Sequence, residues 1–360
     1  MGAVENSLRG QLLIASPVLT DPNFFKTVIL VAEHTAEGAM GLVLNRRTPA
    51  AVADAAPHLV GLGGIDASVF VFKSWYSIPD DMRDPAENPV NALYGFCRFL
   101  GDFLEELKPE YVAVAFDENR GEHCVRTLLY PAYKANREPA PPELKLQFER
   151  CRAVTRALGL ADCADIAFEA DDLIATLAAR MRGSGHKVTI LTRDKDLAQV
   201  LQQGDALWDY PSGRRVSYDQ VPEVYGVRAE QIADFLALTG DAVDNIKGVR
   251  GVGPKTAATL LKHYPTLEEI YANLDGVGRL GIRAAASLPE RLRSQRAEAD
   301  LAQQLTRVRY DAPVAAAAAD MRRRSPDLNG LDALYDGAGF GESLRRQARR
   351  IAEGAQLPMR

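Results

Sequence analysis

The sequence predicts an α/β fold in which a mainly parallel sheet, surrounded by helices, is followed by a helical module. Two observations predict the sheet: between residues 64 and 222, apolar runs of strand length end at aspartates, and segments with helical spacing separate them. A third observation predicts the helical module, because a glycine-rich turn at 248–253 leads directly into a helix-like segment. The strand–helix–strand order favours parallel pairing with right-handed crossovers.

Residues 1–63 have a different pattern. Two apolar runs in this segment, at 12–15 and 28–32, are typical of strands, and Asp21-Pro22-Asn23 is typical of a turn between them. Glu37-Gly38 and Gly41 suggest a second turn before a further apolar run at 42–44. An alanine-rich stretch with several glycines then runs to Gly64. The segment is small for an independent hydrophobic core.

Helices and strands alternate from Ile65 onward. Asn88-Pro89 predicts a helix start, because Asn caps helices and Pro suits the first helical position. Apolar residues at helical spacing continue to Leu107, and Pro109 ends this helix. The other elements expected in this part are strands at 111–116 and 188–192 and helices at 142–158 and 170–181.

Nine acidic residues lie at or near the ends of these elements: Asp66, Asp117, Glu169, Asp171, Asp172, Asp194, Asp196, Asp241 and Asp244. Asp66, Asp117 and Asp194 directly follow apolar runs or lie just beyond them. In an open parallel sheet, ligands bind beyond the carboxyl ends of the strands. Carboxylates gathered there repel one another unless hard cations neutralise them, and Mg²⁺ or Mn²⁺ takes such oxygen ligands. The pattern predicts metal-dependent phosphate chemistry.

Each acidic motif also has a purely structural interpretation. Acids at 169–172 favour the positive end of a helix dipole, and Asp194-Lys195-Asp196 is equally typical of a solvated loop. Two such motifs in consecutive strand–helix units favour the metal site over coincidence. Asp241 and Asp244 are also consistent with a capped helix turn, although they lie just before the glycine-rich turn.

The glycine-rich turn has the composition of a phosphate-binding element. Gly248, Gly251 and Gly253 let the backbone approach a phosphate closely. The helix that follows would offer free N–H groups at its start, with Lys255 and Thr256 beside them. A purely structural turn is the competing interpretation.

The stretch 120–137 interleaves basic and aromatic residues, namely Arg126, Tyr130, Tyr133, Lys134 and Arg137. Basic side chains pair with backbone phosphates and tyrosine offers a stacking face, so the stretch suits single-stranded nucleic acid. A solvated loop whose two tyrosines pack on the core explains the composition equally well.

The net charge, the cysteines and the apolar runs of the chain provide evidence about its binding partners and its cellular compartment. The 360-residue chain has a formal net charge of −5, which argues at first against nucleic acid, but bound cations would neutralise the acidic cluster. Four scattered cysteines without a Cys-x-x-Cys pair argue against a structural zinc site and a disulfide framework. With no signal-peptide pattern and no apolar run of membrane-spanning length, we expect a cytoplasmic protein without membrane contact.

Seven motifs occur in an order that resembles a known family: I-D-A-S, A-F-D-E, Y-P-A-Y-K-A-N-R, E-A-D-D, T-R-D-K-D-L, T-G-D-A-V-D-N and G-V-R-G-V-G-P-K-T-A. Through them, residues 65–310 resemble the bacterial 5′-nuclease family of 5′–3′ exonucleases and 5′-flap endonucleases, which includes the N-terminal domain of DNA polymerase I. The resemblance implies a PIN-like domain with a helical arch at 64–222, a helix-hairpin-helix domain at 223–312 and a helical tail at 313–360. We expect the stand-alone type of nuclease.

The resemblance also implies a catalytic role for the acidic residues. All nine would hold two or more Mg²⁺ or Mn²⁺ ions, with Asp66 and Asp117 in the catalytic group and Asp241 and Asp244 at the more distant metal position. Lys134 would lie at the arch with Arg137 and steady the scissile phosphate. Arg126, Tyr130 and Tyr133 would lie nearby on the DNA.

The implied partner is DNA with a 5′ end or a 5′ flap. The turn with Gly248, Gly251, Gly253, Lys255 and Thr256 would bind duplex backbone, with a K⁺ ion on the carbonyls of Val249 and Val252. The resemblance implies a monomer with no obligate protein partner.

Two departures from the family lead to alternative hypotheses. Residues 59–65 stand where the family has an unbroken first strand, and three glycines there predict a poor strand that displaces Asp66. Lys73 also stands where arginine is common. A DNA-junction binding protein with impaired catalysis is therefore an alternative to the nuclease.

A second resemblance concerns the start of the chain. Residues 7–60 resemble the N-terminal part of the AlgH-like family. We therefore interpret residues 1–63 as a partial AlgH-like segment that is fused to the nuclease. An AlgH-like regulatory protein is thus a further hypothesis. A PIN-type ribonuclease is disfavoured, because such domains seldom carry the glycine-rich hairpin.

Overall fold

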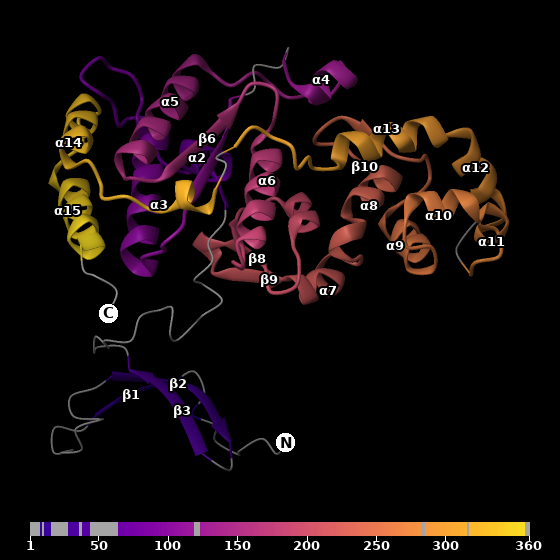
Figure 1. Ribbon diagram of the computed structural model, residues 1–360, viewed down its shortest axis with the longest axis horizontal. Coiled ribbons are helices and arrows are strands. Elements are labelled where there is room, and N and C mark those ends of the chain that lie inside the picture. Colours follow the sequence, from indigo (N-terminus) through magenta and orange to yellow (C-terminus); the bar gives the residue numbers. More distant parts are fainter. Residues whose placement is uncertain are drawn as a thin grey trace. The chain divides into compact units, whose positions relative to one another are not determined.

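The computed structural model describes residues 8, 11–15, 28–35, 38–43, 64–118, 123–281, 285–314 and 317–356. The chain divides into two compact units, Met1–Ala55 and Ala56–Arg360 (Figure 1). The first contains an antiparallel sheet in the order β1-β2-β3, with β1 at Leu12–Ile14, β2 at Val28–Thr35 and β3 at Gly38–Val43. Strands β1 and β2 confirm the two predicted there, whereas β3 includes Gly38 and Gly41, where a turn was expected. The predicted turn at 21–23 lies outside the described residues.

The second unit contains a six-stranded sheet whose strand order is β6-β5-β4-β7-β8-β9. The strands are β4 (Gly64–Asp66), β5 (Ala113–Asp117), β6 (Ala161–Asp165), β7 (Thr189–Leu191), β8 (Ala206–Asp209) and β9 (Arg214–Ser217). Every pairing from β6 to β8 is parallel, and the edge pair β8–β9 is antiparallel. This order confirms the predicted mainly parallel α/β fold and places the ends of β5, β4 and β7 side by side.

Helices cover both faces of this sheet (Figure 1). One face packs against α2 (Ala67–Ser77), α3 (Asn91–Leu107) and α5 (Pro142–Ala157), and the other packs against α6 (Ala170–Gly183). Strand β5 divides its side chains between the two cores, with Val114 and Phe116 in the first and Ala113 and Ala115 in the second. This period of two is that of an extended strand. The small alanines leave room for α6.

Strand β4 forms at the centre of the sheet although its surroundings are rich in glycine. Ile65 is fully buried and pairs with Val114 on β5. A Cβ atom on Gly64 would lie 2.8 Å from Cγ1 of Ile174 on α6, well inside normal carbon–carbon contact. Glycine here permits close packing of helix on strand, so the expectation that Asp66 is displaced from the end of a central strand is wrong. Residues 59–63 of the expected poor strand lie outside the described residues.

Helix α3 begins later than the Asn88-Pro89 signal predicts. Its first residue is Asn91 and its N-cap is Val90, while the backbone N–H and the side-chain amide of Asn88 donate to the carboxylate of Asp84. A tight turn from Asp84 to Asn88 therefore uses the asparagine that was expected to cap the helix. The end of the helix agrees with the prediction, and Lys108 is its left-handed C-cap (φ 47°).

The predicted helical arch contains one short helix in the described residues. Helix α4 (Val125–Leu129) is followed by turns over 131–136, and residues 119–122 lie outside the described ranges. The N–H of Lys134 donates to the Asp244 carbonyl (3.0 Å), and Asn245 Nδ2 donates to the Ala132 carbonyl (2.7 Å). This segment therefore contacts the acidic turn of the helical module directly.

The helical module comprises α7 (Val221–Tyr225), α8 (Ile232–Thr239), α9 (Pro254–His263), α10 (Leu267–Ala272), α11 (Leu274–Val277), α12 (Leu288–Ser294) and α13 (Arg296–Thr306). The short antiparallel pair β10 (Gly240–Asp241) and β11 (Ile246–Lys247) lies between α8 and α9. Short 3₁₀ helices lie at Lys195–Val200, Tyr210–Ser212, Tyr218–Gln220, Ala229–Gln231, Ala285–Ser287 and Ala318–Met321.

Two C-terminal helices, α14 (Leu328–Gly337) and α15 (Glu342–Gln356), return to the sheet domain and pack against α5 and α3. Their apolar side chains join the core formed by α2 and α3. The four cysteines are buried free thiols. In the described ranges, no helix combines the length and the apolar character that crossing a bilayer needs.

Candidate active site

The ends of three adjacent strands bring acidic side chains together. Asp66 ends β4, Asp117 ends β5, and Asp194 follows β7 by three residues. Glu169 is the N-cap residue of α6, and Asp171 lies in the first turn of that helix. Because β5, β4 and β7 are neighbours in a parallel sheet, these carboxylates share the edge where such folds bind ligands.

Two hydroxyl groups orient these carboxylates. Thr192 Oγ1 donates to Asp66 Oδ2 (3.0 Å) and accepts the N–H of Asp194 (2.9 Å), so it joins the ends of β4 and β7. Ser68 Oγ donates to Asp117 Oδ2 (2.7 Å). Sequence reasoning missed both hydroxyl residues. The signal that could have found them is their position, because each lies two residues from an aspartate of the cluster.

The carboxylates of this cluster perturb one another. Burial and the charges of Asp117 and Asp194 raise the pKa of Asp66 to about 7. Burial and the charges of Asp194, Asp66 and Asp117 raise the pKa of Asp171 well above its ordinary value. A cation placed among such groups would stabilise their ionised forms.

A second acidic group adjoins the first at Asp194. Burial and the charge of Asp194 raise the pKa of Asp196 to about 7, and Asp241 and Asp244 act in the same direction. Asp194 Oδ1 accepts the N–H of Asp196 (2.8 Å), which fixes this short turn. Oδ1 of Asp196 is buried and has no hydrogen-bond partner in the described part of the chain. A carboxylate oxygen buried in this way is costly unless a ligand binds it.

The two acidic groups fit divalent cations in their chemistry. All the ligand atoms are oxygens, burial and then mutual charge raise the pKa values of Asp66 and Asp196, and Asp196 Oδ1 lacks a hydrogen-bond partner among the described residues. Within the described ranges, no three acidic, histidine or cysteine side chains already converge as a finished set of ligands. A bound cation would therefore be held by carboxylates that lie near one another, although their oxygen atoms do not already converge on one position.

Lys134 brings positive charge to these acids. Its ammonium donates to Glu169 Oε1 (2.6 Å) and lies 3.7 Å from Asp244 Oδ2. Burial disfavours the ionised form of Glu169, but the charges of Lys134 and Arg126 outweigh it, so the pKa of Glu169 is lowered. Arg137 forms a further ion pair with Asp244. The structure thus brings together both cations predicted to act on the scissile phosphate.

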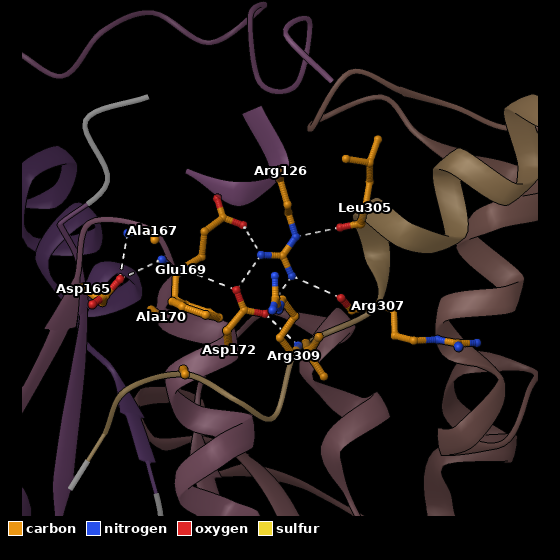
Figure 2. A network of polar contacts seen from close by, with 12 residues as sticks. Arg126, Asp165, Ala167, Glu169, Ala170, Asp172, Leu305, Arg307 and Arg309 are labelled. Atoms are coloured by element: carbon orange, nitrogen blue, oxygen red, sulfur yellow. Dashed lines mark hydrogen bonds and ion pairs between the residues drawn. The ribbon is translucent and has the colours of Figure 1, made fainter. Parts of the chain in front are cut away.

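Arg126 and Asp172 do not take the positions predicted for them (Figure 2). Arg126 is 6% exposed, and its guanidinium donates to both oxygens of Asp172 (2.6 and 2.8 Å). Asp172 is 1% exposed and also accepts the N–H groups of Glu169 (3.2 Å) and Arg309 (2.8 Å). Arg126 therefore points into the protein and not toward DNA, and both oxygens of Asp172 are occupied by a guanidinium.

The two tyrosines of the basic stretch lie against the protein. Tyr133 is 6% exposed, and its hydroxyl donates to Glu169 Oε2 (2.8 Å) and lies 3.2 Å from Asp244 Oδ2. Tyr130 packs partly buried against the core around α6 and the helical module. Tyr133 thus leaves no free ring face for a base. The large exposed apolar side chains of α4 are Leu128 and Leu129.

The glycine-rich turn presents its backbone at the start of α9. A Cβ atom on Gly248 would lie 2.2 Å from the backbone of the preceding hairpin, and Gly251 has a positive φ of 82°. Gly253, the N-cap residue of α9, has open space where a side chain would be. Lys255 is exposed beside it and Thr256 is partly buried.

Two buried valines anchor this turn to the helical module. Val249 and Val252 belong to the core, and the Val249 carbonyl accepts the N–H of Val252 (3.0 Å). Arg250, between them, donates its N–H to Oε1 of Gln295 (2.8 Å), the residue that caps α13. The turn is therefore held by its own hydrogen bond and by the helix behind it.

Family models match most of the second unit. A model for the 5′-3′ exonuclease N-terminal resolvase-like domain matches residues 62–226, and one for the 5′-3′ exonuclease C-terminal SAM fold matches residues 227–329. A 5′-3′ exonuclease from Aquifex aeolicus is 32% identical over 267 residues, which are 74% of this chain and 88% of that protein. The chain belongs to the 5′-3′ exonuclease family. This confirms the family predicted from the seven motifs.

Longer relatives of this 5′-3′ exonuclease family member are DNA polymerases. DNA polymerase I from Pseudomonas aeruginosa is 36% identical over 296 residues, and that from Caldicellulosiruptor bescii is 34% identical over 265 residues. These matches cover 81% and 72% of this chain, which spans about a third of the length of either polymerase. An AlgH-like family model matches residues 12–80, which confirms the second resemblance and overlaps the exonuclease match over 62–80.

Solved structures of nucleases share the fold of this 5′-3′ exonuclease family member. A structure of T5 5′-exonuclease with bound divalent metal ions (zinc) has a TM-score of 0.55 at 18% identity and covers 82% of this chain and 99% of that one. The catalytic core of Rad2 in complex with DNA substrate has a TM-score of 0.56 at 13% identity, with 82% and 92% covered. At such identities the likeness is one of fold.

Proposed function

We propose that this chain cleaves DNA as a metal-dependent 5′–3′ exonuclease and 5′-flap endonuclease. The observation that carries the proposal is the cluster of Asp66, Asp117 and Asp194 at adjacent strand ends with Asp171 from the first turn of α6, where burial and mutual charge raise the pKa values of Asp66 and Asp171. Such a cluster at the ligand-binding edge of a parallel sheet suits chemistry on a charged phosphate. Membership of the 5′-3′ exonuclease family supports the same conclusion.

Two groups of acids would hold Mg²⁺ or Mn²⁺. The first group is Asp66, Asp117, Asp171 and Asp194, and the second is Asp196, Asp241 and Asp244, which adjoin Asp194. Bound there, the cations would supply the activation of water and the charge stabilisation of an in-line displacement at phosphorus. The hydroxyls of Thr192 and Ser68 would keep two of the aspartates oriented.

Lys134 and Arg137 would bind the scissile phosphate. Lys134 pairs with Glu169 and Arg137 with Asp244, at the edge of the acidic cluster. A phosphate offers these cations negative charge and oxygen acceptors like those of the carboxylates, so it would compete for them as a partner. Their charge would stabilise the phosphate further as negative charge develops during cleavage.

The glycine-rich turn would bind the duplex part of the substrate. The open backbone at Gly253 and the exposed Lys255 lie at the start of α9, where free N–H groups favour a phosphate. A K⁺ ion on the carbonyls of Val249 and Val252 would extend this contact. Recognition of backbone and bend selects a free 5′ end or flap and not a base sequence. The protein would act in the cytoplasm as a monomer, with catalysis in 64–222 and duplex binding in 223–312.

Cleavage of a 5′-labelled flap duplex tests this function. Wild-type protein is expected to release 5′-phosphorylated fragments with Mg²⁺ and none with EDTA. Asp194→Asn is expected to abolish cleavage and keep duplex binding, and Asp219→Asn, at an exposed acid outside the cluster, is the matched control with unchanged cleavage. Tight, salt-dependent binding without cleavage by the wild type would reject the nuclease and support the junction-binding alternative.

A further inference from the structure

Arg126 joins chain segments that the proposed function uses separately (Figure 2). It lies on α4 in the basic stretch, yet its side chain is buried against Asp172, which is in the first turn of α6. Its Nε donates to the Leu305 carbonyl (2.8 Å), and Nη2 donates to the Arg307 carbonyl (3.2 Å). Both carbonyls lie where the chain leaves α13. One guanidinium thus connects the arch segment, the start of α6 and the helical module.

Asp172 makes the same connection from the other side. It accepts the N–H of Arg309 (2.8 Å) from the segment that leaves α13. It also accepts the N–H of Glu169 (3.2 Å), which completes a capping box at the start of α6. Arg126 and Asp172 together therefore bond to three backbone groups within 305–309.

One end of this connection reaches the glycine-rich turn. The turn donates the N–H of Arg250 to Gln295, which caps the start of α13. Helix α13 packs against α8 and leads directly into segment 305–309. Packed helices carry displacements as rigid elements, so the position of the turn and the position of this segment are linked.

The other end of the connection reaches the acidic cluster. Arg126 Nη1 lies 3.1 Å from Glu169 Oε2, and Asp172 holds the backbone N–H of the same residue. Asp171 is its near neighbour in the first turn of α6. A bidentate guanidinium–carboxylate pair is directional, and removing either partner leaves a buried charge uncompensated. The Arg126–Asp172 pair therefore fixes the position of Glu169 at the start of α6.

We propose that Arg126 and Asp172 are positioning residues that set the distance between the duplex-binding turn and the carboxylate cluster, and so select the phosphodiester bond that is cut. The inference rests on the proposed nuclease function and adds the source of its cleavage-site precision. Neither residue touches DNA, and both act through Glu169 and segment 305–309. Successive base pairs rise by about 3.4 Å, so a small shift of the turn brings a neighbouring bond to the cluster.

The test is the distribution of cleavage positions on a 5′-flap duplex, read at single-nucleotide resolution in single-turnover reactions. Wild-type protein is expected to cut one bond predominantly. Arg126→Lys keeps the charge and loses the planar fork, so it is expected to spread cleavage over adjacent bonds and to slow cleavage at the original bond by about 100-fold. Asp172→Asn is expected to act in the same way. Duplex affinity should change by less than about threefold in both variants.

Arg182→Lys is the matched control. Arg182 forms a buried ion pair with Asp205 (2.7 Å), which precedes β8 at the edge of the sheet opposite the cluster. This variant is expected to lose stability and to keep the wild-type cleavage pattern. If Arg126→Lys behaves like it, with less active protein cutting the same bond, Arg126 is merely structural and the proposal is rejected.

Hydrogen exchange of the free protein separates this inference from the nuclease proposal. Arg126→Lys is expected to raise exchange jointly in peptides covering 169–173 and 305–311, whereas Arg182→Lys should raise it around Asp205. Wild-type protein that binds DNA without cutting it rejects the nuclease function, and joint exchange then still supports the link between module and cluster. Exchange raised in one of the two peptides alone rejects the link.

Discussion

Lys134 and Glu169 face one another at the edge of the acidic cluster, with the lysine ammonium 2.6 Å from Oε1 of the glutamate. Lys134 reaches this position from a left-handed backbone conformation (φ 54°), and its N–H bond to the Asp244 carbonyl helps to hold it there. Such a conformation is costly outside glycine and persists where the surroundings enforce it. The pair places a positive charge beside the acids proposed to bind metal.

Lys134→Ala is expected to lower the single-turnover rate of flap cleavage by about 10²- to 10³-fold, because the ammonium would stabilise charge that develops during cleavage. Duplex affinity, measured by fluorescence anisotropy, should change little. Lys187→Ala is the control, since that exposed ammonium donates to the Gln203 carbonyl outside the cluster. Equal losses of rate and affinity would assign Lys134 to simple DNA binding.

Asp196→Asn is expected to remove one class of bound divalent cation. The buried Oδ1 of Asp196 lacks a partner in the described residues, and burial with the charge of Asp194 raises its pKa to about 7. A cation there gains a ligand and relieves the repulsion. Calorimetric titration with Mn²⁺ should show two classes of site in the wild type and in Asp219→Asn, and one in Asp196→Asn. An unchanged titration would exclude Asp196 as a ligand.

Gly64→Ala is expected to destabilise the protein by about 1–3 kcal/mol, because the added Cβ atom overlaps Ile174 in a packed core. Urea unfolding measures this free energy. The cost should shrink in an Ile174→Ala background, where the clashing atoms are gone. Gly183→Ala, which meets nothing within 4 Å near the end of α6, is the control and should not destabilise. An equal cost of Gly64→Ala in both backgrounds would contradict the packing account of β4.

The lowered pKa of Asp84, a residue away from the active site, predicts that the unfolding free energy depends on pH. Burial opposes its ionisation, but hydrogen bonds from Arg150 and Asn88 prevail and lower the pKa of Asp84 from 3.8 to about 2. A lowered pKa stabilises the folded state above the unfolded value, and this contribution is lost as pH falls toward the folded value. The difference in unfolding free energy between wild type and Asp84→Asn should therefore be full above about pH 5 and shrink toward about pH 2. A difference that stays constant over this range in urea unfolding would contradict the assignment. Arg150→Ala should weaken the dependence.

Two central strands could be predicted from the sequence because they carry local signals: Asp117 and Asp194 follow or lie near apolar runs, and those runs become β5 and β7. Strand β4 was expected to be poor because of the glycines around it, and its packing against β5 and α6 is what forms it. Strand β6 was not predicted, because Ala161–Asp165 alternates small and acidic residues at the edge of the sheet and offers no apolar run. Its place depends on pairing with β5, which a local pattern does not report.

The different roles of Asp171 and Asp172 could not be separated from the sequence. The two residues are identical and adjacent, but they point about 100° apart around the helix and so meet different neighbours. Asp171 stays with the cluster, while Asp172 meets Arg126, which lies 46 residues earlier in the chain. Tertiary packing alone brings that partner to α6, and it converts a predicted metal ligand and a predicted DNA contact into one buried pair.

The missing side chain at Gly64 also limits how such a chain can be recombined. AlgH-like and exonuclease similarity overlap across 62–80, and Gly64 lies inside that overlap, pressed against Ile174. A spliced sequence that crosses this point keeps the packing against Ile174 without strain only if it supplies glycine there. Any larger residue would push α6 outward and carry Glu169 and Asp171 away from the other acids. Within the overlap of the two family matches, the contact between Gly64 and Ile174 therefore restricts which residues a fusion junction can place at the start of β4.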